Sequence, residues 1–239
     1  MQDFTFEGPL GPIECLVEPN RGMRNAVLVM AHGFRGSRES GGRAAGIAYQ
    51  CAAHCSVVRF NFTGTRILSL QVAELRAVIA AVRERQPGCD VYLLGRSLGG
   101  AASIVTASQE PELKRLILWA TPNNLRETFR HVMTDEYYER LDAGEALEFD
   151  DERGHCMLTP DFLTDFDKYD LAWILRNWQG CPVLLLHCKG DDTVLVEQAL
   201  RNKELLGEKA QLRLWDGGDH SFTEYSEEAG AVIADWLAE

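Results

Sequence analysis

One serine lies between glycines at the spacing that a sharp strand-to-helix turn requires. The stretch Gly95-Arg96-Ser97-Leu98-Gly99 follows an apolar run and precedes a helical pattern. In this G-x-S-x-G arrangement, glycines two residues before and two after the serine leave room for the chain to reverse. The turn presents the Ser97 hydroxyl above a helix N-terminus, where negative charge is favoured. The pattern therefore predicts Ser97 as a nucleophile, with Gly95 and Gly99 as the glycines of the turn.

An acid and a histidine follow two later apolar runs, and such groups are what a serine needs to become reactive. Asp191 and Asp192 come after the run 183–187, and His220 comes after the run 211–215. A histidine takes the serine proton and returns it to the leaving group, while a carboxylate holds the imidazole in the required tautomer. Triads are known in the chain order serine, acid, histidine. We expect His220 to be the base, and we favour Asp191 over Asp192 as the acid.

A glycine-containing loop, His32-Gly33-Phe34, directly follows the apolar run 26–31. Acyl transfer needs two preorganised N–H donors for the negatively charged oxygen that develops at the carbonyl. One donor comes from the residue after the nucleophile, here Leu98, and the other from a loop after an earlier strand. We expect the second donor to be the backbone N–H of Phe34, and we expect His32 to brace the loop.

Apolar runs and amphipathic helical patterns alternate along most of the chain. An antiparallel hairpin is expected at 4–6 and 13–17, strands at 26–31, 57–61, 91–94, 116–120, 183–187 and 211–215, and helices at 42–55, 70–85, 98–108, 197–205 and 227–237. Strands that are apolar on both faces and separated by helices predict an α/β fold with a mostly parallel sheet covered by helices. Functional groups gather at the carboxyl ends of such strands, which is where the nucleophile, acid and base are expected.

The alternation stops in residues 122–178, which carry helix signals and no convincing strand. We therefore expect a single α/β domain, formed by residues 1–121 and 179–239, with a helical cap formed by residues 122–178 over the strand ends. Aromatic side chains of the cap could line a pocket, or they could pack the cap onto the body. They are Phe129, Tyr137, Tyr138, Phe149, Phe162, Phe166, Tyr169, Trp173 and Trp178.

The charge of the chain is acidic and unevenly distributed. The 239 residues carry 24 basic and 36 acidic side chains, a net charge of −12. This balance argues against a nucleic-acid partner and against docking on an anionic membrane surface. The segment 135–152 holds nine acids and one base, and so accounts for −8 of the −12. That segment is interpreted as a solvated helical face, with repulsion of anionic substrates as the alternative.

Cysteine usage and the apolar pattern predict a cytoplasmic protein. The seven cysteines are scattered, which is typical of reduced thiols. Residues 1–8 contain no apolar run, and no stretch approaches the length of a membrane span. Cys51, His54 and Cys55 lie close together but lack further ligands, so no metal is expected. The expected chemistry also needs no organic cofactor, and the oligomeric state stays open, with a homodimer as one alternative.

The stretches HGFRG, GRSLGG, HCKGDDTV and GGDHSF together resemble those of α/β-hydrolases over nearly the whole chain. Within that superfamily they are most similar to bacterial intracellular serine esterases of the cinnamoyl (feruloyl) esterase and dienelactone-hydrolase-like branches. The resemblance implies the α/β-hydrolase fold. It maps Ser97, Asp191 and His220 onto the catalytic triad, and Phe34 and Leu98 onto the oxyanion donors. Dienelactone hydrolases often carry a cysteine nucleophile, so the serine favours the esterase branch.

These features lead to the hypothesis of a serine carboxylic-ester hydrolase that acts on a small-molecule ester through an acyl-enzyme. A thioesterase, or a small aminopeptidase or acyl-peptidase, is an alternative, because the triad sets acyl transfer while the pocket selects the leaving group. An inactive binding protein with the hydrolase fold is a third hypothesis, although such proteins usually lose a triad member. Residues 61–66 depart from the relatives, which usually carry a longer loop there as one wall of the substrate site.

Overall fold

The computed structural model describes residues 1–64, 66–151 and 154–239. Three residues within the ranges discussed above therefore lie outside the described part: Thr65 of the segment 61–66, and Glu152 and Arg153 of the cap.

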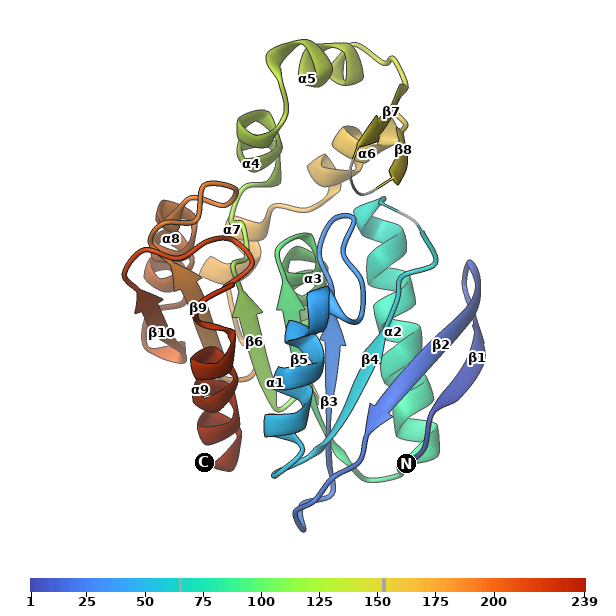
Figure 1. Ribbon diagram of the computed structural model, residues 1–239, viewed down its shortest axis with the longest axis vertical. Helices are drawn as coiled ribbons and strands as arrows, with labels where there is room; N and C mark the ends of the chain where they lie inside the picture. Colours follow the sequence, from blue (N-terminus) through green and yellow to red (C-terminus); the bar gives the residue numbers. More distant parts are fainter. Residues whose placement is uncertain (65, 152–153) are drawn as a thin grey trace.

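The centre of the fold is one eight-stranded sheet. Its strands, in spatial order, are β1 (Phe4–Gly8), β2 (Gly11–Glu18), β4 (Ser56–Phe60), β3 (Ala26–Ala31), β5 (Asp90–Arg96), β6 (Arg115–Trp119), β9 (Val183–Cys188) and β10 (Ala210–Trp215). The hairpin β1–β2 is antiparallel and joins β4 antiparallel, and every other pairing in this sheet is parallel. The carboxyl ends of the parallel strands therefore lie along one edge, beneath the cap (Figure 1).

Helices cover both faces of the sheet because the central strands are apolar on both sides. In β3, Val27 and Val29 enter one core, while Leu28 and Met30 enter the other. The first core lies beneath α2 (Leu68–Arg85), α3 (Leu98–Gln109), α7 (Leu171–Arg176) and α8 (Val196–Leu206), and the second beneath α1 (Arg43–Cys51) and α9 (Ser226–Ala238). The mostly parallel sheet with flanking helices is confirmed, as is the N-terminal hairpin.

Between β6 and β9 the chain forms the cap. It comprises α4 (Leu125–Val132), α5 (Asp135–Asp142), β7 (Leu147–Asp151), β8 (Gly154–Leu158), α6 (Asp161–Thr164) and a 3-10 turn (Asp165–Lys168) that precedes α7. The cap contains helices, as expected, but it also contains a strand pair that the sequence did not reveal, because β7 and β8 pair as an antiparallel hairpin. Acidic residues are poor strand formers and hide the pattern. The period-2 burial of Leu147 with Phe149, and of Cys156 with Leu158, was the available signal.

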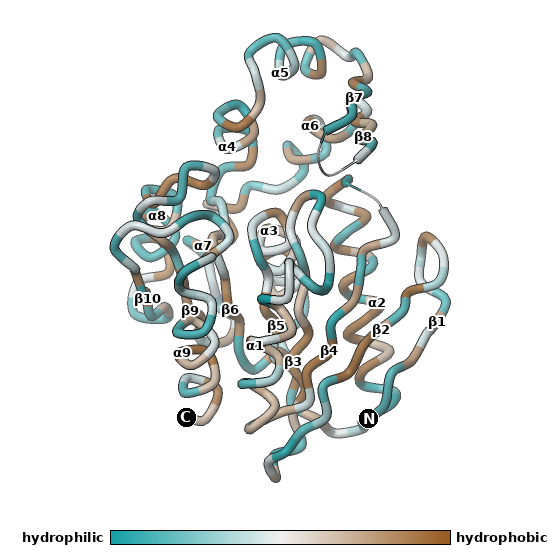
Figure 2. Tube along the Cα trace, viewed as in Figure 1, coloured by the Kyte–Doolittle hydropathy of each residue, from teal (hydrophilic) through white to brown (hydrophobic). Residues whose placement is uncertain are grey.

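The acids of the cap are distributed around a few basic side chains. The contacts are Asp135 and Glu139 with Arg130, Glu136 and Glu145 with Arg140, Asp142 with Arg126, Glu148 and Asp150 with His155, and Asp151 with Arg35. Most of these side chains are exposed, so each pair stabilises the cap only weakly. Figure 2 shows α5 and β7 as mostly hydrophilic, in contrast with the apolar strands of the sheet. Several acids of the cap therefore lie in surface ion pairs with arginines.

Neither a membrane span nor a metal site is found among the residues that the structure describes. Within these ranges, no helix is both long and apolar enough to cross a membrane. The same residues include no group of three or more histidine, cysteine or acidic side chains placed to hold a metal ion. Cys51 and Cys55 are buried, and burial raises the pKa of both thiols.

A buried carboxylate fixes the loop that follows β4. Glu74 of α2 is fully buried, and its carboxylate accepts hydrogen bonds from the backbone N–H of Thr63, at 3.2 Å, and from the Thr63 hydroxyl. Burial raises the pKa of Glu74, while the hydrogen bonds from Thr63 oppose the rise. The folded protein therefore holds the proton of Glu74 more tightly than the unfolded chain does.

The pH dependence of stability follows from this difference. The free energy of unfolding should fall as pH rises from the unfolded pKa, about 4.3, through the higher folded pKa, because the carboxylate then ionises in a buried site. Glu74→Gln stays neutral, so the variant should gain stability relative to wild type as pH rises across this window. Urea denaturation of both proteins at several pH values tests this, and a pH-independent difference between them would contradict it.

Candidate active site

The turn between β5 and α3 presents Ser97 in a strained conformation. Ser97 has φ 53° and ψ −123°, in the left-handed region that favours glycine. Its backbone N–H donates to Trp119 O at 2.9 Å, and its carbonyl accepts from Gly100 N at 2.8 Å. A Cβ at Gly95 would lie 2.7 Å from the Gly100 Cα, and a Cβ at Gly99 would lie 2.7 Å from the backbone oxygen of Ala31. The turn therefore requires glycine at these two flanking positions.

Asp191 holds the ring of His220. The Nδ1 atom of His220 lies 2.8 Å from Oδ2 of Asp191, which is 3% exposed. The other carboxylate oxygen, Oδ1, accepts from the backbone N–H groups of Thr193 and Val194, both at 2.9 Å. Burial acts to raise the pKa of Asp191, but the hydrogen bond and charge of His220 and the Val194 N–H outweigh it, and the pKa is lowered. Asp192 is exposed, and its Oδ1 accepts from the Thr193 hydroxyl at 3.4 Å.

The loop after β3 packs directly on the turn that carries Ser97. A Cβ at Gly33 would lie 2.9 Å from the Cβ of Ser97, so the loop approaches Ser97 closely only because residue 33 is glycine. His32 braces this loop: its Nε2 accepts from Phe62 N at 3.2 Å, and its Nδ1 lies 2.9 Å from Gly33 O. Burial lowers the pKa of His32, which keeps the ring neutral with its proton on Nδ1. Phe34 follows Gly33 and lines the same cavity as Ser97 and Leu98.

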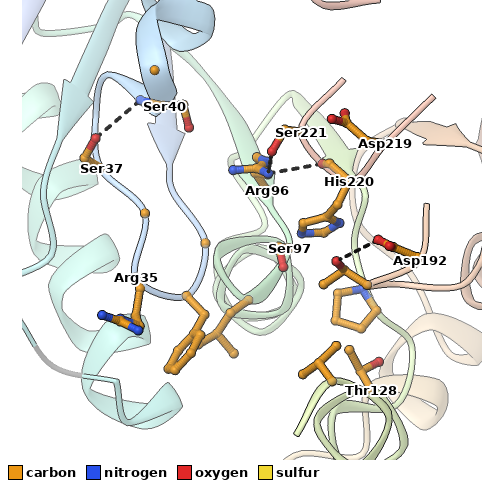
Figure 3. A pocket seen from close by; sticks show the side chains of 18 of the residues that line it. Arg35, Ser37, Ser40, Arg96, Ser97, Thr128, Asp192, Asp219, His220 and Ser221 are labelled. Atoms are coloured by element: carbon orange, nitrogen blue, oxygen red, sulfur yellow. Dashed lines mark hydrogen bonds between the residues drawn. The ribbon is translucent and has the colours of Figure 1, made fainter. Parts of the chain in front are cut away.

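A cavity of about 650 Å³ opens over these groups. Ser97, Leu98, Phe34 and His220 line it, while Asp191 lies behind His220 in the protein interior. Figure 3 shows Ser97 and His220 at the centre of the lining residues, with Arg96 and Ser221 on one side and Thr128 of α4 on the other. The Ser97 turn, the loop that carries His220 and the loop after β3 therefore meet beneath the cap.

One aromatic side chain of the cap reaches this cavity among the nine considered. Phe129 of α4 lines it. Its ring packs on Phe34, with centroids 5.4 Å apart, and on Phe162 at 4.8 Å. Phe162 in turn packs on Phe166, with centroids 4.9 Å apart. The aromatic cap residues other than Phe129 in this chain of contacts therefore pack the cap onto the body. Trp173, by contrast, is 60% exposed.

A family model described as "Alpha/beta hydrolase family" matches residues 28–236. The chain belongs to the alpha/beta hydrolase family. The match covers the sheet from β3 to β10, the cap and most of α9. A search of curated proteins finds no match.

Solved structures share the fold of this hydrolase at low sequence identity. Est1E from Butyrivibrio proteoclasticus is similar with a TM-score of 0.84 and 16% identity, and the match covers 100% of this chain and 98% of that one. The esterase domain of a Rhodothermus marinus protein has a TM-score of 0.78 and 23% identity, covering 98% and 96% of the two chains. A puromycin-hydrolyzing peptidase from Mycobacterium tuberculosis has a TM-score of 0.72 and 17% identity, covering 99% of this chain and 38% of that one.

Sequence reasoning missed the residues that hold the histidine loop of this hydrolase. Arg96 donates from Nη2 to the backbone oxygen of His220 at 3.1 Å and to Ser221 Oγ at 3.2 Å. Phe222 is fully buried at φ 57°, with its ring against Trp119 at 5.4 Å and Trp215 at 5.3 Å. The aromatic residue two positions after His220 was the available signal. The hydrogen bonds from Arg96 to the His220 loop depend on how β5 and that loop are placed in the fold, so the sequence around Arg96 could not reveal them.

His187, the last buried polar residue of β9 before Cys188, also has a role that the sequence did not reveal. Its Nε2 lies 2.7 Å from Val194 O and 3.5 Å from Oδ2 of Asp191. Burial lowers the pKa of His187, so the neutral ring donates to the Val194 carbonyl. This bond fixes the turn 191–194, whose N–H groups orient the carboxylate of Asp191.

Proposed function

We propose that this protein is a serine hydrolase that cleaves small carboxylic esters through an acyl-enzyme on Ser97. The observation that carries the proposal is the hydrogen-bonded pair of His220 and buried Asp191 at the cavity into which the strained Ser97 turn opens. Two solved structures that share the fold are described as Est1E and an esterase domain, which supports an ester as the substrate.

In the proposed mechanism, Asp191 sets the tautomer of His220. An ionised carboxylate only accepts hydrogen bonds, so the short contact places the proton of His220 on Nδ1. The lone pair on Nε2 is then free to take the proton of the Ser97 hydroxyl as Oγ attacks the carbonyl carbon. The Asp191 carboxylate stabilises the imidazolium that forms.

The oxyanion of the tetrahedral intermediate would be held by backbone N–H groups. Leu98 is the first residue of α3, and the first N–H groups of a helix have no partner within the helix. The N–H of Phe34 would be the second donor, from the loop that packs on Ser97. Collapse of the intermediate breaks the C–O bond, and His220 gives its proton to the leaving alcohol. Water then attacks the acyl-enzyme with the same proton transfers, which releases the acid and restores Ser97.

Fluorophosphonate labelling tests the nucleophile directly. The wild type should be labelled covalently, and Ser97→Ala should lose both the label and ester hydrolysis. Ser37→Ala is the matched control, because Ser37 lines the same cavity and should leave the label in place. A wild type that resists labelling would favour an inactive binding protein, and label retained by Ser97→Ala would exclude Ser97 as the nucleophile.

A substrate panel then separates ester hydrolysis from the alternatives. Matched ester, thioester and aminoacyl-amide substrates share an acyl group and differ only in the leaving group. The proposal predicts the highest kcat/KM for the ester, with all turnover dependent on Ser97. A higher value for the thioester or the amide would reassign the protein to a thioesterase or a peptidase.

A further inference from the structure

The catalytic cavity has two unlike sides. Phe129 and Val132 of α4 form an apolar side beneath the cap. The opposite side carries the hydroxyl groups of Ser37, Ser40 and Ser221, which come from the loop before α1 and from the loop after β10. Figure 3 shows these three serines on the side of the cavity away from α4. A bound substrate therefore meets hydrocarbon on one side and polar groups on the other.

The polar side offers hydroxyl hydrogens to a ligand, because the hydroxyl oxygens of Ser37 and Ser221 already accept hydrogen bonds from the protein. Ser37 Oγ lies 3.3 Å from the backbone nitrogens of both Glu39 and Ser40, which donate to it. Ser221 Oγ accepts from Nη2 of Arg96. A hydroxyl oxygen that accepts in this way keeps its own hydrogen to donate. The hydroxyl hydrogens of Ser37 and Ser221 are therefore available to a ligand rich in acceptors.

Three arginines line the cavity, and they differ in their partners. Arg35 pairs with Asp151, and Arg96 holds the His220 loop. Arg43, the first residue of α1, is half-buried, and its Nε is buried without a hydrogen-bond partner. Among the described residues, no carboxylate lies within the 4.0 Å of an ion pair with Arg43. Its guanidinium folds back over the loop before α1 and packs against Gly41. If residue 41 had a Cβ, that atom would lie 3.2 Å from Nη2 of Arg43.

Asp219 is an acid on this side of the cavity, and it forms no ion pair with Arg43 within 4.0 Å. Both carboxylate oxygens of Asp219 accept from Thr223: one from the backbone N–H at 2.9 Å, and the other from the hydroxyl at 2.6 Å. Burial acts to raise the pKa of Asp219, yet these hydrogen bonds, with help from the charge of Arg43, lower it. The lowered pKa favours the ionised carboxylate, which interacts with Arg43 at a distance but forms no ion pair with it within 4.0 Å, so the N–H donors of Arg43 can still bond to a ligand.

We infer that the substrate is an ester that carries a carboxylate, and that Arg43 binds this carboxylate at the polar side of the cavity. The inference rests on the proposed function and names its substrate class. A guanidinium is planar and always charged, and its paired N–H donors match the geometry of a carboxylate. The acids of the cap oppose such a substrate less than their number suggests, because Arg35, Arg126, Arg130 and Arg140 form ion pairs with several of them.

Two pairs of esters test the inference. Mono-4-nitrophenyl glutarate and 4-nitrophenyl pentanoate have acyl chains of the same length, and only the first has a carboxylate there. 4-Acetoxybenzoate and 4-acetoxybenzamide place the same contrast in the leaving group. In at least one pair the wild type should prefer the anionic member by about tenfold in kcat/KM, the order expected for a hydrogen bond to a charged group. The preference should shrink as ionic strength rises.

Variants assign this preference to Arg43. Arg43→Gln should lower the anionic-to-neutral ratio about tenfold, and Arg43→Lys should keep part of it. Arg213→Gln is the matched control: it removes the same charge from an exposed position on β10, outside the cavity, and should leave the ratio unchanged. Thermal melts establish that each variant is folded.

The outcomes separate the inference from the proposed function. Equal kcat/KM for both members of both pairs would overturn the inference, and so would a preference that survives in Arg43→Gln. In either case, Ser97-dependent turnover of the neutral esters would still support the proposed function. Absence of Ser97-dependent turnover of every ester would overturn both.

Discussion

Asp191→Asn should lower kcat about 10⁴-fold, whereas Asp192→Asn should leave kcat within about threefold of wild type. The reason lies in how the carboxylate is held. Oδ1 of Asp191 accepts from the N–H groups of Thr193 and Val194, so an asparagine would keep its oxygen there and turn its NH₂ group toward His220. Nδ1 of His220 would then have to accept, and its proton would move to Nε2. That nitrogen could no longer take the proton of Ser97.

Steady-state kinetics on a neutral ester measure this effect. KM should change little, because the lost interaction acts on the proton transfer rather than on substrate binding. The rate of fluorophosphonate labelling should fall in parallel with kcat. Asp192 is the natural control, since it is adjacent in sequence, carries the same charge and makes no recorded contact with His220 in the described structure. Similar losses from both variants would contradict the assignment of Asp191 as the acid.

Gly99→Ala should destabilise the protein by about 1–3 kcal/mol and lower kcat/KM by about 10²-fold or more. A Cβ at residue 99 would press on the backbone oxygens of Ala31 and His32, at the start of the loop that carries Phe34. Backbone atoms cannot rotate away as the end of a side chain can, so the loop itself must shift. The shift would move the Phe34 N–H away from the carbonyl under attack, and an oxyanion donor would be lost.

Gly46→Ala provides the contrast for this experiment. Gly46 lies inside α1, and a Cβ there meets no atom within 4 Å. Alanine should therefore stabilise the helix by about 0.5–1 kcal/mol and leave the reaction untouched. Urea denaturation and ester kinetics on the two variants measure both effects. A Gly99→Ala protein with wild-type kcat/KM would show that the two loops do not need this close approach.

The sheet could be predicted from sequence because each central strand is a short apolar run with a helix on either side. The burial of β3 on both faces, and the pairing of β1 with β2, both follow from local pattern. The cap hairpin could not be predicted in this way. Its strands carry acids and a histidine on their exposed sides, and their pairing is a tertiary property that overrides weak local propensity.

The candidate site shows a similar division between local and tertiary information. Residues at strand ends mark the chemistry, so Ser97 and His220 stand out in the sequence. The choice between Asp191 and Asp192 depends on the turn 191–194, which directs adjacent side chains to opposite sides. The contribution of Arg96 depends on β5 and the loop after β10 lying together, and they are more than a hundred residues apart in the chain.

The ion pair between Arg35 and Asp151 joins the hairpin of the cap to the loop that follows β3. Arg35 follows Phe34 in the loop beside Ser97, and its guanidinium contacts both the Asp151 carboxylate and the Gly154 backbone oxygen of the cap hairpin. A chimaera that receives a cap without those acceptors would leave the guanidinium of Arg35 without them. In the evolution of new specificities, such an exchange therefore favours a matching change at residue 35, because its side chain is only 6% exposed and an unpaired charge there is costly.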